Sequence, residues 1–112
     1  MNTQRASVDD SSNESTDERF SFVSKVGAHV KVIGLVHGVR FRASMAELAF
    51  ECGVAGWVRN VPDGSVEAYL EGEEKDIARM VEWANRGPLG ARVDSVEVET
   101  RQVRNLHGFR IE

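Results

Sequence analysis

Apolar and polar positions divide the chain into an acidic beginning without periodicity and a regularly patterned remainder. Residues 1–20 are polar and acidic, so almost nothing in them could form a core. Residues 1–28 are therefore expected to be a flexible, acidic N-terminal tail, and residues 29–112 the folded domain. In residues 29–36, "HVKVIGLV", β-branched residues dominate and predict a buried strand.

Two segments carry the spacing of an amphipathic helix, with apolar residues recurring every three or four positions. The first stripe consists of Phe41, Met45, Leu48, Ala49 and Cys52, and Gly53 is a suitable stop. The second consists of Ile77, Met80, Val81 and Ala84. Acidic residues at 73, 74 and 76 suit the N-terminal end of this second helix, Arg86 suits its C-terminal end, and Gly87-Pro88 ends it.

Further strands are predicted on both sides of the second helix. Residues 54–61, "VAGWVRNV", and residues 65–72, "SVEAYLEG", flank the turn "PDG", where proline presets one φ and glycine accepts a positive one. They form a hairpin whose Val66, Ala68 and Leu70 face the core. Residues 93–100, "VDSVEVET", alternate in the same way, and residues 109–112, "FRIE", offer a short final strand.

The order strand, helix, strand, strand, helix, strand predicts an α+β fold of the ferredoxin-like βαββαβ type. In this sandwich, an antiparallel sheet carries two helices on one face. The opposite face is expected to be more polar, or covered only at its edges.

Composition narrows the classes of function. The chain has 112 residues, 41% of them hydrophobic, which suits one small domain. Its net charge is −4, so a general nucleic-acid footprint is not expected. A single cysteine excludes an internal disulfide, and His29 and His107 lack the spacing of metal ligands. No apolar run could span a membrane and no secretory signal precedes the domain, so we expect a cytoplasmic monomer without metal or cofactor.

The segment "GLVHGVRFR", residues 34–42, joins the first strand to the first helix. A glycine turn before a helix presents successive backbone N–H groups, and a nearby arginine can grip two phosphate oxygens. The 34–40 loop and Arg42 could therefore bind a phosphate. The alternative is an ordinary turn with solvated arginines, and spacing alone leaves both open because short glycine motifs are weakly specific.

Asn60 lies where the second strand enters its turn. Turn asparagines often serve the backbone. However, in this fold the end of the second strand need not lie far from the 34–40 loop, and a side-chain amide can both donate and accept hydrogen bonds. Asn60 could then hold a water molecule beside a bound phosphate.

Two stretches resemble the signatures of the acylphosphatase family: "VIGLVHGVRFR" and "GWVRNVPDGSVEAYLEG". The second signature is matched throughout, at Gly56, Trp57, Val58, Arg59, Asn60, Gly64, Val66 and Gly72. The first departs at one position, where His37 replaces the usual glutamine. The resemblance covers roughly residues 29–112.

This resemblance implies hydrolysis of the carboxyl–phosphate bond of acyl phosphates, giving a carboxylate and inorganic phosphate, which would also compete with the substrate. It implies that Arg42 binds the phosphate and that Asn60 positions the attacking water, without a metal ion or a phosphoenzyme. The residues expected to bind substrate are Val36, His37, Gly38, Val39, Arg40 and Phe41, although the Arg40 side chain could equally be solvated.

Alternatives remain open at this stage. His37 could simply keep the hydrogen bonding of a glutamine. In a second hypothesis, protonated His37 adds positive charge, so that phosphate would bind more tightly at acidic pH. The domain could also be a phosphate- or RNA-binding module without catalysis, or act within a larger maturation or carbamoyl-transfer system.

Overall fold

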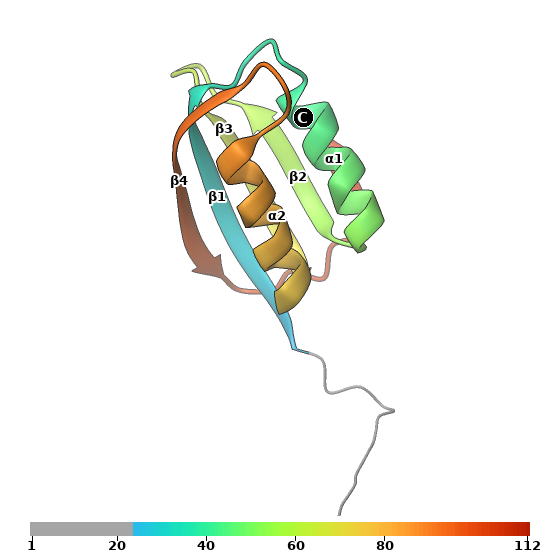
Figure 1. The fold of residues 1–112 in the computed structure, drawn as a ribbon. Helices are drawn as coiled ribbons and strands as arrows, with labels where there is room; N and C mark the ends of the chain where they lie inside the picture. The colour runs from blue at the N-terminus through green and yellow to red at the C-terminus, as the bar shows by residue number, and fades with distance from the viewer. Residues whose placement is uncertain (1–23) are drawn as a thin grey trace, which may run out of the picture.

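The computed structural model describes residues 24–112. Five strands and two helices alternate along this part of the chain in the predicted βαββαβ order, followed by a fifth strand (Figure 1). They are β1 (Lys25–Leu35), α1 (Phe41–Cys52), β2 (Ala55–Asn60), β3 (Val66–Glu73), α2 (Glu74–Arg86), β4 (Arg92–Arg101) and β5 (Phe109–Ile111). The ferredoxin-like α+β prediction is confirmed.

The first strand begins earlier than the sequence suggested. β1 starts at Lys25, and its first residues pair with β3, with Lys25 opposite Glu73 and Ala28 opposite Leu70. The expected boundary at residue 29 is therefore wrong by four residues. The rest of the predicted tail, residues 1–23, lies outside the described residues.

The strands form one sheet in the order β4-β1-β3-β2-β5. β1 is antiparallel to β3 and β4, and β2 is antiparallel to β3, whereas β5 lies parallel to β2. The expectation of a purely antiparallel sheet is therefore wrong for the last strand. β4 ends at the end of the sheet where β2 begins, so a chain that crosses from there to the far edge enters β5 in the direction of β2.

Both helices cover the same face of the sheet, as predicted (Figure 1). The strands bury the alternating side chains of this face, and the helices bury the stripes read from the sequence. This core includes Val30, Val32, Val58, Val66, Ala68, Leu70, Phe41, Met45, Ala49, Ile77, Met80 and Ala84. Leu48, Cys52 and Val81, also read as apolar-face residues, pack against its edge.

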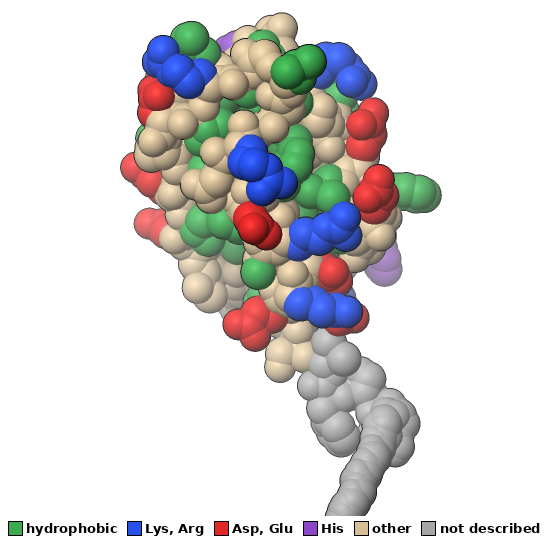
Figure 2. All heavy atoms as spheres, in the orientation of Figure 1, with side chains coloured by type: hydrophobic (Ala, Val, Ile, Leu, Met, Phe, Trp, Pro, Cys, Tyr) green, Lys and Arg blue, Asp and Glu red, His purple; other side chains and the backbone are tan. Residues whose placement is uncertain are grey.

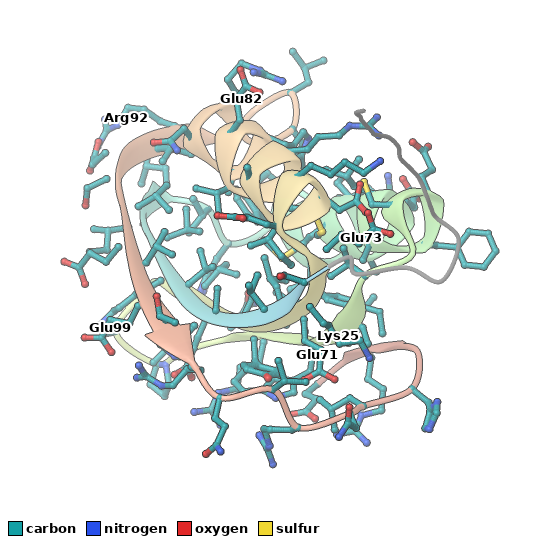
Figure 3. All side chains as sticks on the ribbon, turned by 90° about the horizontal axis from the view of Figure 1, so that it is seen from below. Lys25, Glu71, Glu73, Glu82, Arg92 and Glu99 are labelled. Carbon is teal, nitrogen blue, oxygen red and sulfur yellow. The ribbon has the colours of Figure 1, made fainter. Side chains whose placement is uncertain are left out.

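The opposite face of the sheet is covered in part by the connection between β4 and β5. Glu71 is only 1% exposed there. Its carboxylate accepts hydrogen bonds from the backbone N–H groups of Arg104 (2.7 Å) and Leu106 (2.5 Å) and from the Tyr69 hydroxyl (2.7 Å). In Figure 3 the connection runs beside Glu71 and Lys25. Glu71 therefore anchors the segment that delivers β5 to its place beside β2.

The ionisation of this pair follows from burial and hydrogen bonding. Burial raises the pKa of Glu71, but the donors from Arg104, Tyr69 and Leu106, helped by the charge of Lys25, outweigh it and lower the pKa below 4.5. Burial and the neighbouring Glu71 carboxylate raise the pKa of Tyr69 to about 12. The pair is therefore an ionised carboxylate beside a neutral phenol at neutral pH.

Replacing Glu71 with glutamine should lower the free energy of unfolding by about 2 kcal/mol at pH 7. The side-chain NH₂ of glutamine would then face a backbone N–H, and neither of these two donors would have an acceptor. The stabilisation from ionised Glu71 is complete above its unfolded pKa of 4.5 and is lost as the pH falls through the lower, folded value. The deficit should therefore shrink towards pH 3 in urea unfolding. Exposed Glu97→Gln is the matched control, and equal stability of the two variants at pH 7 would contradict the anchoring role.

Candidate active site

The 34–40 loop is held in an unusual backbone conformation. Gly38 has φ 75° and Arg40, the residue immediately before α1, has φ 61° and ψ 30°. A Cβ added at Gly38 would meet nothing within 4 Å. Glycine is therefore favoured at this position because of its positive φ, and not because a side chain would lack space. For Arg40 this left-handed conformation costs on the order of 1 kcal/mol. Strain of this kind gathers at functional sites.

The backbone donors of this loop point to an anion site. In the described chain, no side chain caps α1 and no acidic residue occupies its first turn. The first helical hydrogen bond runs from Ser44 to the carbonyl of Arg40 (2.9 Å), and the N–H groups of Gly38 to Ala43 have no acceptor within residues 24–112. Unpaired N–H groups at the positive end of a helix dipole favour a bound anion.

Apolar side chains from the same loop fix it to the core. Val36 is 1% exposed and Phe41 is 2% exposed. The Phe41 ring packs on Trp83, with ring centroids 5.1 Å apart. Val39 also packs against the core. These three side chains hold the loop in place, so its contribution to a ligand would come from the main chain.

The two arginines of the loop region have different surroundings. Arg42 lies in the first turn of α1 and is half-buried, and its Nη1 donates to the main-chain carbonyl oxygen of Glu112 at 3.2 Å. Arg40 is exposed, with its guanidinium 3.4 Å from the Glu47 carboxylate. An arginine held by one hydrogen bond to a carbonyl keeps most of its donors for a ligand.

Asn60 is the last residue of β2 and faces the same pocket as Arg42. β1 and β2 both run antiparallel to β3, so they run in the same direction and end at the same end of the sheet. A pocket of about 400 Å³ lies there. It is lined by Val36, Gly38, Arg40, Phe41, Arg42, Ala43, Asn60 and Ile111. Of the predicted site residues, His37 and Val39 are absent from this lining.

His37 instead links the 34–40 loop to the β2–β3 turn. Its Nε2 lies 2.8 Å from the carbonyl oxygen of Ser65. A carbonyl only accepts, so Nε2 donates an N–H. The same carbonyl accepts from the N–H of Val61, the residue after Asn60 (2.9 Å). His37 therefore ties the loop to the backbone that carries Asn60, which agrees with its reading as a substitute for glutamine.

The turn itself is stiffened by Asp63. Its carboxylate accepts from the hydroxyl of Ser65 (2.6 Å) and its N–H (2.9 Å), and it pairs with Lys31 at 3.2 Å. The Ser65 donors, followed by Lys31, lower the pKa of Asp63 to about 2. The carboxylate is thus ionised at neutral pH, and Ser65 is held where it can accept the bond from His37.

Reasoning from the sequence missed Ala43, Ile111 and the carbonyl of Glu112 at this site. Ile111 reaches the pocket because β5 lies beside β2, where the N–H of Glu112 donates to the carbonyl of Val58 at 2.8 Å. The alternation of "FRIE" placed Phe109 and Ile111 on one face, but no local signal names the neighbour of that strand. Ser65 was likewise read only as part of the hairpin.

Metal and membrane features were also sought. Within residues 24–112, no group of three or more His, Cys, Asp or Glu side chains is placed to hold a metal ion. In the same part of the chain, no helix has both the length and the apolar character needed to cross a bilayer.

The fold is an α+β sandwich, with a pocket and a candidate anion site at the N-terminus of its first helix. The chain belongs to the acylphosphatase family, whose profile matches residues 28–111. It is 45% identical over 89 residues to an acylphosphatase of Thermococcus kodakarensis, covering 80% of this chain and 98% of that protein. It is 50% identical over 82 residues to an acylphosphatase of Syntrophobacter fumaroxidans, covering 73% and 84%.

The architecture agrees with a solved structure of this family. The structure of an acylphosphatase from Coxiella burnetii superposes with a TM-score of 0.77 at 38% sequence identity. The match covers 79% of this chain and 93% of that one.

The link through His37 can be tested with two substitutions. His37→Gln keeps a side-chain donor and should leave inhibition by inorganic phosphate unchanged at pH 7. His37→Ala frees the loop and should weaken inhibition by about tenfold, the loss of one hydrogen bond of ordinary strength. Measuring inhibition constants from pH 5 to 8 also tests the charge hypothesis. Identical pH profiles for the parent and His37→Gln would exclude it, and normal inhibition of His37→Ala would exclude the link.

Proposed function

We propose that this protein is an acylphosphatase that hydrolyses the carboxyl–phosphate bond of acyl phosphates to a carboxylate and inorganic phosphate. Membership of the family supports this activity. The observation that carries it is the convergence of three features on one pocket: the unpaired N–H groups of the 34–40 loop, the Arg42 guanidinium and the Asn60 amide.

In this proposal the phosphoryl group sits at the N-terminus of α1. Backbone N–H groups from Gly38 onward donate to its oxygens, and Arg42 donates in two parallel bonds. His37 and Val39 act indirectly, by holding the loop. These donors are in position before the substrate arrives, so little reorganisation is needed as charge develops on the phosphoryl oxygens.

Water is the nucleophile in the proposed reaction. None of the side chains that line the pocket is a Ser, Thr, Cys, His, Asp or Glu, so none can form a phosphoenzyme or offer a carboxylate to a metal ion. Asn60 accepts a hydrogen bond from the water and aims its oxygen at phosphorus, opposite the leaving group. The water oxygen bonds to phosphorus, the bond from phosphorus to the acyl oxygen breaks, and a phosphoryl oxygen takes the water's proton.

The pocket suits this chemistry because the leaving group is a carboxylate. A carboxylate leaves without protonation, so a general acid is not required. Phosphoryl transfer then depends mainly on positioning and on stabilisation of negative charge. We infer that neither a metal ion nor another cofactor takes part, and that the protein acts as a cytoplasmic monomer on a small-molecule substrate.

The rival reading as an RNA-binding module finds less support. Such modules stack bases on exposed aromatic rings of the sheet. Tyr69 is 3% exposed, and the guanidinium of Arg104 lies over its ring at 5.6 Å. The guanidinium of Arg59 lies 5.5 Å from the ring of Trp57. On the helix-bearing side, basic and acidic side chains are interspersed rather than gathered into a basic patch (Figure 2).

Arg42 should be essential for both binding and turnover. Arg42→Gln is expected to lower kcat/KM for acetyl phosphate by at least about 10³ and to abolish competition by inorganic phosphate, because charged and bidentate contacts are both lost. Assays should include a chelator, which leaves the parent fully active if no metal takes part. Arg86→Gln, which changes an exposed arginine of α2 that does not line the pocket, is the matched control. Arg42→Gln with activity near that of the parent would contradict the assignment.

Asn60 should act on the rate and not on phosphate binding. Asn60→Ala is expected to reduce kcat by about 10²–10³, the effect of losing one preorganised polar group. The inhibition constant of inorganic phosphate should stay within about twofold, because phosphate is held by the loop and Arg42. Asn85→Ala on α2 provides a control for loss of an amide. Near-normal turnover by Asn60→Ala would remove the water-positioning role.

A further inference from the structure

The phosphate pocket adjoins a second, larger hollow that the proposed chemistry does not use. This groove, of about 1030 Å³, lies between α1 and the C-terminal segment that contains β5. Its lining includes Ala43, Ala46 and Phe50 of α1, together with Phe109 and Ile111. Ala43 and Ile111 line both the groove and the phosphate pocket, so the two hollows adjoin at these residues.

The walls of the groove are mostly apolar. Ala43, Ala46 and Phe50 follow one another at spacings of three and four, so they form one stripe of α1. Phe109 and Ile111 point to the same side of β5 because they are two residues apart. Phe50 is 87% exposed and Ile111 is 50% exposed, so both present apolar surface to solvent. Because Ala43 and Ala46 have short side chains, the space between α1 and β5 stays open.

The three carboxylates that line the groove already have partners. At the α1 rim, Glu47 lies 3.4 Å from the guanidinium of Arg40, and Glu51 lies 3.8 Å from that of Arg79. Glu71 is buried beneath its own donors, and the charge of Lys25 acts on it. The other ionisable side chains of the lining are Lys25 and His107. The groove therefore offers mostly apolar surface, which favours an apolar occupant.

We propose that this groove holds the acyl group of the substrate, and that the preferred substrates are acyl phosphates with apolar chains. This inference rests on the proposed function, since the phosphoryl group must occupy the adjoining pocket. The chain would leave that pocket between Ala43 and Ile111 and run along α1 towards Phe50. Phe50 lies seven positions after Ala43, about 10 Å along the helix, which accommodates roughly eight carbons of an extended chain.

The test is a series of acetyl, butyryl, hexanoyl and octanoyl phosphate. Complete burial of a methylene would raise kcat/KM about fourfold, so in a half-open groove we expect about twofold per methylene up to octanoyl. Ala46→Gln should place a bulky polar side chain in the groove and lower kcat/KM for octanoyl phosphate by at least about tenfold. Acetyl phosphate, which is too short to reach Ala46, should be unaffected. Exposed Ala78→Gln on α2 is the matched control.

A second variant covers the possibility that Ala46→Gln fails to fold. Phe50→Ser changes a solvent-exposed side chain and should remove only the gain between hexanoyl and octanoyl phosphate. Normal turnover of acetyl phosphate without any gain in the longer substrates would overturn the groove assignment and leave the proposed function intact. An undiminished gain in both variants would also overturn it. Failure of every acyl phosphate to react would instead overturn the proposed function, and the groove assignment with it.

Discussion

The site depends on one constraint of strand direction: β1 and β2 both run antiparallel to β3, which lies between them. Their C-terminal ends therefore meet at one end of the sheet. The loop that follows β1 supplies backbone donors there, and the last residue of β2 supplies Asn60. The hydrogen bond from His37 to Ser65 then fixes the loop to the turn after β2. Topology brings the two segments near each other, and this bond sets their separation.

A second set of contacts completes the pocket from the other face of the sheet. The buried carboxylate of Glu71 captures two backbone N–H groups of the β4–β5 connection. That connection leads β5 to the edge beside β2, where Ile111 closes one side of the pocket and the carbonyl of Glu112 accepts from Arg42. The buried Glu71 carboxylate, through the β4–β5 connection, thus determines which groups lie beside Arg42. Removing one partner of such a charge is costly because the other is left unpaired.

Features set by local pattern could be predicted from the sequence. The stripes of both helices, the inward face of the hairpin and the turn at Gly64 follow from spacing and from the needs of the backbone. Features set by contacts between distant segments could not. Alternation along β3 puts Tyr69 and Glu71 on the face opposite the core, but it does not show what covers that face. The parallel direction of β5 and the arrival of Ile111 at the pocket depend on a connection more than thirty residues beyond Glu71. The roles of Arg42 and Asn60 remain predictions.

In the proposed site, the left-handed turn at Arg40 lets main-chain N–H groups share recognition of the anion with the Arg42 side chain. Backbone N–H groups are present whatever side chain a residue carries, and proline alone removes one. Most substitutions between Gly38 and Ala43 would therefore preserve the backbone N–H donors, provided the turn keeps its shape. By contrast, the side chains that line the neighbouring groove can vary one at a time. In the proposed function, the main-chain contact with the phosphoryl group would therefore survive most substitutions, whereas the groove's contact with the acyl chain would change with each side chain that lines it.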